Sequence, residues 1–260
     1  MSKHFQYPFN PIEWPAVPHD FTGDNNLGIY TSETTQRYVY GTRYITWDGR
    51  VYKYMLLTTG GCVSYHGVHG TLEAETTYTT AVAATAGDRF MTITDATTAA
   101  EDSLAGALVL VYDSTSDNST QHHIVGNELG NGTNIKVYTE FPLPHSITVS
   151  DSVEMFGNQY SAVSEATYHY GAWLGVPTVT AATTYKIWAQ TWGPCIVSPG
   201  NTSMDDAAAS ERMAFWVSNA VVDEVDDANV TAGKNQVAGY IWNAGTGGIA
   251  GPQIYLTCST

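Results

Sequence analysis

A chain of 260 residues can bury roughly 70–75% of the surface that it exposes when unfolded, so its fold does not depend on disulfides or metals. The composition, with 17 Tyr, 7 Trp and only 13% charged residues, is typical of β-sheet proteins. A net charge of −15, from 25 acidic and 10 basic residues, excludes DNA or RNA binding across a broad surface, because phosphate contact requires clustered Lys and Arg.

The cysteines and the apolar stretches exclude further classes of protein. Cys62, Cys195 and Cys258 are far apart and lack CxxC spacing, which argues against a disulfide framework or a structural zinc site. No stretch approaches the ~18–20 apolar residues of a membrane span, and the N-terminal residues lack the apolar run of a signal peptide. We therefore expect a protein that is made in a cytoplasm and has no membrane partner.

Residues 1–30 have the composition of an extended arm. Four prolines at positions 8, 11, 15 and 18 exclude a helix, because proline fixes φ and lacks an amide hydrogen. An arm of this kind must place its apolar side chains on another surface, either on its own domain or on a neighbouring subunit. The five candidate interface residues are Phe5, Tyr7, Phe9, Ile12 and Trp14.

The stretch 37–56 predicts a β-hairpin. Asp48-Gly49 lies between two β-rich runs and predicts a two-residue type I′ turn, in which Gly takes the positive φ. This turn places Trp47 opposite Arg50 and Ile45 opposite Tyr52, on a largely apolar face. The other, more polar face is expected to carry Tyr44, Thr46, Val51 and Lys53.

Short strands separated by turn residues follow from Gly87-Asp88 to about residue 160, and their spacing predicts a small barrel or sandwich inserted between outer elements. A short helix is expected at Ala96–Ala105. The boundaries that we expect are 75–162 for the insert, with an outer β-domain formed by 31–74 and 163–260. The predicted strands are Arg89–Thr94, Leu108–Tyr112, His122–Val125, Asn134–Tyr138 and Ser152–Phe156.

Tyr185–Pro194 predicts a core strand of the outer domain. Its side chains alternate with a two-residue period, and Gly193-Pro194 is expected to end it, because proline cannot donate to a ladder. The remaining predicted elements are a helical turn within Asn201–Arg212 capped by Ser203, strands Met213–Val217, Val237–Asn243 and Gln253–Cys258, and an acidic loop at Asp223–Asp227. The fold class is therefore mainly β, with antiparallel sheets in a sandwich or barrel-like core.

Clusters of chemically active residues are sparse. Cys62, His66 and His69 have metal-ligand side chains at close spacing, but a fourth ligand is missing nearby, which favours a glycine-rich strand or turn over zinc. His122 and His123 point to opposite faces of a strand. Asp113, Thr115 and Asp117 begin like a calcium loop, but Asn118 replaces the glycine and Ile124 the final Glu. We therefore predict no catalytic residues, no metal and no cofactor.

Four stretches, taken in order, resemble a group of structural proteins of tailed bacteriophages that are encoded near the major capsid gene. They are the hairpin Gly41-Thr-Arg-Tyr-Ile-Thr-Trp-Asp-Gly-Arg-Val-Tyr-Lys-Tyr54, then Ala86-Gly-Asp88, then Tyr185–Pro194, then Val237–Ala244. Lys186-Ile187-Trp188 departs from the usual entry of the third motif, and the arm 1–30 falls outside the resemblance. The motifs consist of turn glycines and aromatics, so they carry no site.

The resemblance implies a virion component, namely a decoration or cement protein that binds the outside of a phage head. The expected partners are the major capsid protein and further copies of the chain, as a homotrimer on threefold sites of the shell; no nucleic acid is expected. Two alternatives stay open. One is a receptor- or glycan-binding fibre or knob subunit, and the other is a polysaccharide-degrading enzyme with paired carboxylates.

Overall fold

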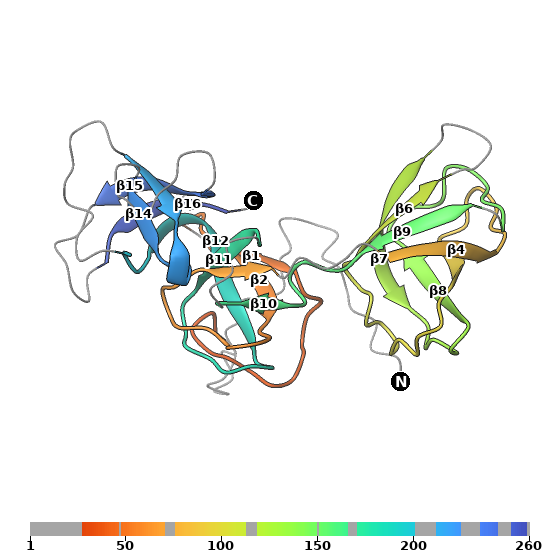
Figure 1. Ribbon diagram of the computed structural model, residues 1–260, viewed down its shortest axis with the longest axis horizontal. Helices are drawn as coiled ribbons and strands as arrows, with labels where there is room; N and C mark the ends of the chain where they lie inside the picture. The colour runs from red at the N-terminus through yellow and green to blue at the C-terminus, as the bar shows by residue number, and fades with distance from the viewer. Residues whose placement is uncertain are drawn as a thin grey trace. The chain divides into compact units, whose positions relative to one another are not determined.

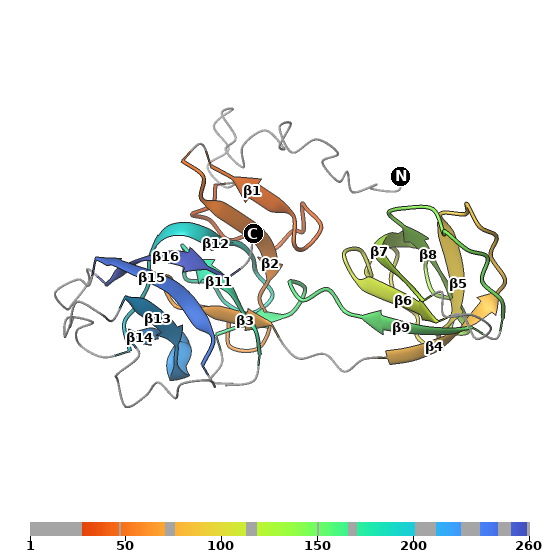
Figure 2. The same ribbon diagram turned by 90° about the horizontal axis from the view of Figure 1, so that it is seen from above.

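A computed structural model of the chain describes residues 28–46, 48–70, 76–112, 119–149, 151–165, 171–200, 212–224, 235–243 and 251–258. These residues fold almost entirely into antiparallel strands, with no α-helix, and they form two compact units (Figures 1 and 2). We call residues 76–159 the barrel unit, and residues 28–70 with 160–258 the outer unit. The mainly β fold class is confirmed. None of the described segments forms an apolar helix of membrane-spanning length.

The barrel unit is a closed six-stranded barrel with the strand order β4-β5-β8-β7-β6-β9. Alternate residues of each strand point inward, as the two-residue period requires, and fill the barrel with aliphatic side chains such as Met91, Ile93 and Ile124. The small barrel expected from the sequence is therefore present. Its strands are β4 (Thr76–Val82), β5 (Phe90–Thr94), β6 (Leu108–Tyr112), β7 (Thr120–Asn127), β8 (Asn134–Thr139) and β9 (Ser152–Phe156).

The outer unit is built on a curled ten-stranded sheet with the order β10-β3-β11-β12-β16-β15-β13-β14, in which β2 also pairs with β12 and β1 pairs with β2. A short 3₁₀ turn, η1 (Ser218–Ala220), joins β13 to β14. Its strands are β1 (Arg43–Ile45), β2 (Val51–Leu56), β3 (Val68–Gly70), β10 (Val163–Ser164), β11 (Trp173–Pro177), β12 (Lys186–Ile196), β13 (Met213–Trp216), β14 (Val222–Glu224), β15 (Val237–Asn243) and β16 (Gln253–Thr257).

Strand β12 is the centre of the outer unit, because it pairs with β2, β11 and β16. Its predicted alternation is confirmed. Ile187 and Ala189 pack into one cluster with Met55 and Leu57, whereas Trp188 packs among tyrosines on the opposite side. Both faces of this part of the strand are therefore buried.

The expected end of this strand at Gly193-Pro194 is wrong, since β12 continues to Ile196 and pairs with β16 throughout that stretch. In a strand, the nitrogen and carbonyl of one residue point to the same side. The Pro194 carbonyl accepts a hydrogen bond from Gln190 Nε2 at 2.8 Å, so the proline nitrogen faces away from β16. The last pair between β12 and β2 is Trp192 with Val51, so no ladder hydrogen bond is lost there.

The hairpin forms, but with a register that differs by one residue from the prediction. Ile45 lies opposite Val51 and Tyr44 opposite Tyr52, because the Thr46 amide donates to the Arg50 carbonyl and closes a longer loop than Asp48-Gly49. Gly49 has φ +86° and occupies the left-handed position of that loop. A one-residue shift changes which side chains share a face. Tyr44 therefore packs with Tyr52 in the core and not on a polar face.

Two smaller predictions are corrected. Residues 96–105 contain irregular backbone and turns where a short helix was expected, because hydrogen bonds to Asn127 hold this segment against β7. Asp223 and Glu224 belong to the buried strand β14, whereas a solvated acidic loop was expected. The helical turn predicted within Asn201–Arg212 lies almost entirely outside the described residues.

Candidate functional site

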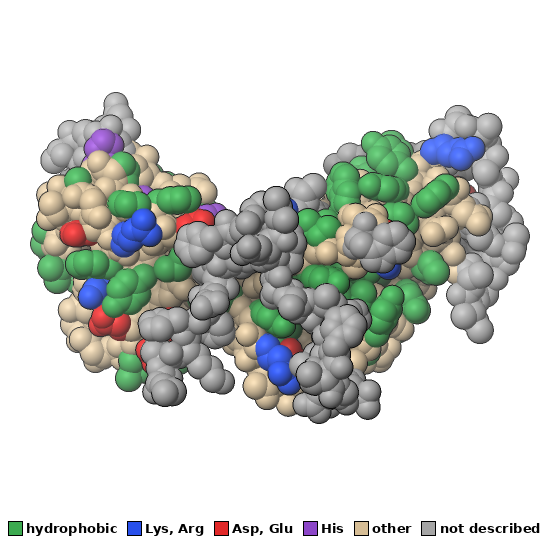
Figure 3. All heavy atoms as spheres, turned by 180° about the vertical axis from the view of Figure 1, so that it is seen from behind, with side chains coloured by type: hydrophobic (Ala, Val, Ile, Leu, Met, Phe, Trp, Pro, Cys, Tyr) green, Lys and Arg blue, Asp and Glu red, His purple; other side chains and the backbone are tan. Residues whose placement is uncertain are grey.

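The outward side of strands β12, β16, β15 and β13 presents a row of apolar side chains to solvent. Cross-strand pairing places Pro194 opposite Tyr255, Tyr255 opposite Tyr240, and Tyr240 opposite Met213. Figure 2 shows these four strands as neighbours in the outer unit, and Figure 3 shows hydrophobic side chains gathered on the surface of that unit. We define the aromatic face as Trp192, Pro194, Ile196, Met213, Tyr240, Trp242 and Tyr255.

The most exposed members of the aromatic face are large. Trp242 is 63% exposed and Tyr240 is 59% exposed, although β15 pairs with a strand on each side; Trp242 lies at the register shift between Ile241 and Asn243. The Trp192 and Tyr255 rings meet edge to face with centroids 5.5 Å apart, which orders this end of the row. Contiguous exposed apolar patches of a few hundred Å² are uncommon on monomeric proteins, and they often belong to interaction sites.

Charge is absent from this part of the sheet. Strands β13, β15 and β16 contain no Asp, Glu, Lys, Arg or His, and the only charged residue of β12 is Lys186, at its far end. The whole chain carries a net charge of −15, so the aromatic face differs sharply from the average of the molecule. The centres of protein interfaces show the same depletion of charge and enrichment in aromatics and Met.

The opposite side of these strands forms a core. Cys195, Ile254 and Leu256 point inward and pack against Trp216, whose ring stacks on Trp173 with centroids 5.0 Å apart. Burial raises the pKa of the Cys258 thiol beside this core to about 12, and the Trp216 indole N–H partly offsets that rise. The sheet is therefore apolar on both sides, but the described residues of the unit cover only one of them.

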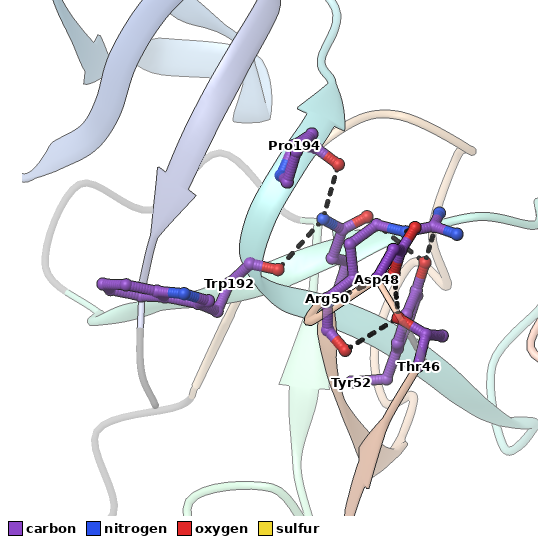
Figure 4. Close-up of polar contacts among 7 residues, drawn as sticks. Thr46, Asp48, Arg50, Tyr52, Trp192 and Pro194 are labelled. Carbon is purple, nitrogen blue, oxygen red and sulfur yellow. Dashed lines mark hydrogen bonds and ion pairs between the residues drawn. The ribbon is translucent and has the colours of Figure 1, made fainter.

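A polar network holds β12 where the row begins (Figure 4). Gln190, which is buried, donates to the carbonyls of Trp192 at 3.1 Å and Pro194 at 2.8 Å, and its Oε1 accepts from the Tyr52 hydroxyl at 3.3 Å. Arg50 Nη1 donates to the same hydroxyl at 3.0 Å. These bonds satisfy the carbonyls that β2 leaves without a ladder partner, so they keep Pro194 in strand geometry.

The far end of this network is an ion pair on the hairpin. Arg50 Nε lies 2.8 Å from Asp48 Oδ2, and the Thr46 hydroxyl also donates to Asp48. Burial opposes ionisation of Asp48, but these hydrogen bonds together lower its pKa. Burial raises the pKa of Tyr52, so its hydroxyl stays protonated and available as a donor. The network therefore supports the strand that carries the aromatic face.

A small pocket of about 240 Å³ of empty space lies elsewhere in the outer unit and is lined by Gly28, Thr31, Glu33, Tyr38, Tyr54, Lys186 and Trp188. Its charged groups have partners within the chain. Glu33 accepts from the Tyr54 hydroxyl at 2.6 Å and pairs with Arg37 at 2.5 Å, and Lys186 donates to the Thr34 carbonyl at 2.7 Å. Much of that space is open to solvent, and the part that can hold the centre of a water molecule is only about 10 Å³, room for about one water molecule and not for a small-molecule ligand.

The predicted ligand-type residues are not brought together. Cys62 is buried, which raises its pKa to about 12, and its thiol donates to the Val179 carbonyl at 3.4 Å. His66 pairs with Glu165 at 2.8 Å, whereas His69 packs edge to face on Trp173. Among the described residues, no three His, Cys, Asp or Glu side chains gather in a metal-binding arrangement.

Two further sets of sequence predictions can be located. His122 points into the barrel and His123 outward, so their opposite orientation is confirmed. The calcium-like residues Asp113, Thr115 and Asp117 lie outside the described residues, and so do the arm residues Phe5, Tyr7, Phe9, Ile12 and Trp14.

Sequence reasoning did not single out the aromatic face. The signal was present in the predicted strands, because Met213–Val217 is apolar at both alternating sets of positions and Val237–Asn243 is apolar at both sets up to Asn243. A strand with one solvent face normally carries polar residues there. Comparison with known proteins adds no relative, since no family model, no curated protein and no solved structure matches the chain.

Proposed function

We propose that this protein is a structural component of a bacteriophage virion, a decoration protein that binds the outside of the capsid and stabilises the head. The observation that carries the proposal is the uncharged aromatic face on β12, β16, β15 and β13. Such a surface serves protein–protein contact and contains no catalytic group. The resemblance of the hairpin Gly41–Tyr54 and of Tyr185–Pro194 to phage structural proteins supplies the class of assembly.

The role fits the construction of the chain. A decoration protein acts by adding contacts between subunits that are already in place, so it needs a stable scaffold and an adhesive surface but no active site. A closed barrel and a large curled sheet provide the scaffold. In this proposal the partners are the major capsid protein and further copies of the chain, as a trimer, and the protein is made in the host cytoplasm and resides on the head.

The test is binding to heads that lack this protein. Purified full-length chain is added to undecorated heads, and occupancy is measured by sedimentation and gel densitometry against increasing protein concentration. We expect saturable binding with a fixed number of copies per head, and a rise in the temperature at which the heads release their DNA. Absence of saturable binding to heads, with binding to purified tails, would overturn the proposal.

A second candidate function is glycan binding as a fibre or knob subunit. The exposed rings of Tyr240 and Trp242 favour it, because sugars stack on aromatic faces of this kind. A glycan array and sedimentation with host-cell envelopes measure this activity directly. Retention on envelopes that free sugar abolishes, together with failure to bind heads, would replace the leading proposal with this one.

The proposal also predicts an absence of catalysis. We expect the purified protein to hydrolyse neither host polysaccharide nor peptidoglycan. Release of reducing ends that disappears in a variant with one carboxylate replaced would favour the hydrolase alternative.

The N-terminal arm is proposed as an additional anchor on the shell or on a neighbouring subunit. Four prolines limit the conformations of residues 1–30 and reduce the entropy lost on docking. Deleting residues 2–20 is expected to leave both β units folded, as judged by circular dichroism, and to weaken binding to heads. Equal occupancy for the truncated and the full-length protein would show that the arm packs on its own domain.

A further inference from the structure

We infer that the aromatic face is covered by the aromatic face of a second copy of this chain. This inference rests on the proposed function, because it names the partner of the same surface. Two identical faces that cover one another are related by a twofold axis, so this contact joins pairs of copies and is distinct from the threefold contact of the proposed trimer. It makes β12, β16, β15 and β13 a self-association surface, on which Tyr240 and Trp242 are the central contacts.

Electrostatics favours a second copy as the occupant. Two copies that each carry a net charge of −15 repel one another, and like charges brought into a contact of low dielectric cost further free energy. Strands β13, β15 and β16 contain no Asp, Glu, Lys, Arg or His, so two copies can meet there without placing charged groups against each other. A partner chosen by charge would be basic and would bind the acidic surfaces of the chain.

The chemistry of the face is complementary to itself. Its members offer rings, a thioether, a proline ring and an aliphatic chain, and none of these groups requires an oppositely charged or hydrogen-bonding partner. Sheet faces pack on one another at about 10 Å with side chains interdigitated. Pairing of two such faces would therefore bury the second apolar side of the sheet in the same way that the unit buries the first.

The exposed area suits the core of a stable contact. Tyr240, Trp242 and Tyr255 are 59%, 63% and 36% exposed, which at about 200 Å² for each free ring amounts to about 320 Å². The other four members raise the area of the face to roughly 500 Å² per copy. A standard interface buries about 800 Å² per partner, of which the centre is apolar and the rim polar.

The test measures the mass of the free protein in solution. Light scattering coupled to gel filtration compares the wild type with a face variant, Tyr240→Ser with Trp242→Ser, across a wide range of concentrations. A matched control is Leu129→Ser with Phe141→Ser, which removes two equally exposed apolar side chains from the barrel unit. Circular dichroism and tryptophan fluorescence check folding. Tyr240→Glu, which adds a like charge to each copy, is a second face variant.

We expect the wild type and the barrel control to exceed the monomer mass of 28.1 kDa and the face variants to weaken association at least about a hundredfold. A wild type that stays monomeric, or face variants that associate like the wild type, would overturn the inference. Head binding separates the two proposals. If the wild type is monomeric and the face variants lose head binding, the aromatic face binds the shell and the inference fails. If the wild type is an oligomer that does not bind heads, the inference holds and the proposed function fails.

Discussion

The barrel unit and the outer unit use the same two-residue alternation with different results. In the barrel, β5 and β9 bury every second side chain, and the outward positions of the barrel include paired charges such as Lys136 with Glu128 at 3.3 Å. In the outer unit, β13, β15 and β16 carry no charge on either side. Closure leaves the barrel without open strand edges, and its exterior mixes charged side chains with exposed apolar ones such as Leu129 and Phe141. The outer sheet keeps a second apolar side, which indicates a surface made for contact.

The comparison teaches that one sheet can carry a buried core on one side and an exposed aromatic face on the other. Trp216 and Trp242 lie on neighbouring strands β13 and β15, yet the first is 1% and the second 63% exposed. Substitutions at the two positions should therefore act on different properties of the protein, stability in one case and association in the other.

The largest decrease in the free energy of unfolding is expected for Trp216→Ala. This change removes the ring that stacks on Trp173 in the outer core, and large-to-small changes of a buried Trp cost about 3–5 kcal/mol. All seven tryptophans lie outside residues 76–159, so fluorescence in urea reports on the outer unit without a barrel signal. The control is Trp242→Ala, measured at low protein concentration, which should change the free energy of unfolding by no more than about 0.5 kcal/mol. Equal losses of unfolding free energy for the two variants would contradict the division of the sheet into a buried side and an exposed side.

A similar loss of unfolding free energy is expected in the barrel unit for Ile93→Ala. Ile93 is fully buried among the inward side chains of the barrel, and Ile-to-Ala changes in cores cost about 2–5 kcal/mol. Because each unit has a core of its own, Ile93→Ala should lower the urea concentration at the midpoint of the barrel transition, which far-ultraviolet circular dichroism detects. The midpoint of the tryptophan-fluorescence transition should stay unchanged. A parallel shift of both signals would show that the two units unfold as one cooperative body.

An intermediate decrease in the free energy of unfolding is expected for Gln190→Ala. The change leaves two carbonyls, those of Trp192 and Pro194, without their hydrogen-bond donor, at a cost of about 1–3 kcal/mol. Urea unfolding followed by both tryptophan fluorescence and far-ultraviolet circular dichroism measures it. Gln121→Ala on the exposed side of the barrel is the control and is read by circular dichroism. Because Gln190 also keeps Pro194 in line with Tyr255, we expect weaker self-association as well. A fully stable variant would show that solvent replaces these bonds.

The smallest effect concerns the pH dependence of the barrel. Burial of His122 lowers its pKa, so the unfolded chain takes up a proton before the folded barrel does. The contribution of uncharged His122 to the free energy of unfolding is complete above the ordinary His pKa of about 6.5. It is lost as the pH falls from there through the lower pKa that His122 has in the folded barrel. Thermal unfolding followed by circular dichroism should show a smaller acid-induced decrease for His122→Gln than for the wild type. Identical pH profiles would mean that His122 is hydrated in the folded barrel.

Much of the fold was predictable from local patterns. Leu108–Tyr112, Ser152–Phe156 and Val237–Asn243 were expected as strands, and the structure has the same bounds. These segments alternate strictly or combine β-branched and aromatic residues, and turn residues such as Gly87 with φ +96° delimit them. Such signals depend on neighbours in the sequence, so the sequence by itself determines strands, turns and the mainly β class.

Only the tertiary structure decided which side of each strand is covered. Pro194 lies inside a strand because β2 has already diverged and Gln190 satisfies the freed carbonyls, and both facts depend on residues far away in the sequence. Asp223 is buried because the segment at Ser198–Gly200 returns beside β14. The aromatic face likewise joins Pro194, Met213, Tyr240 and Tyr255 through the pairing of four strands. Strand order and register are long-range properties, because they follow from the burial of the whole sheet and not from any single segment.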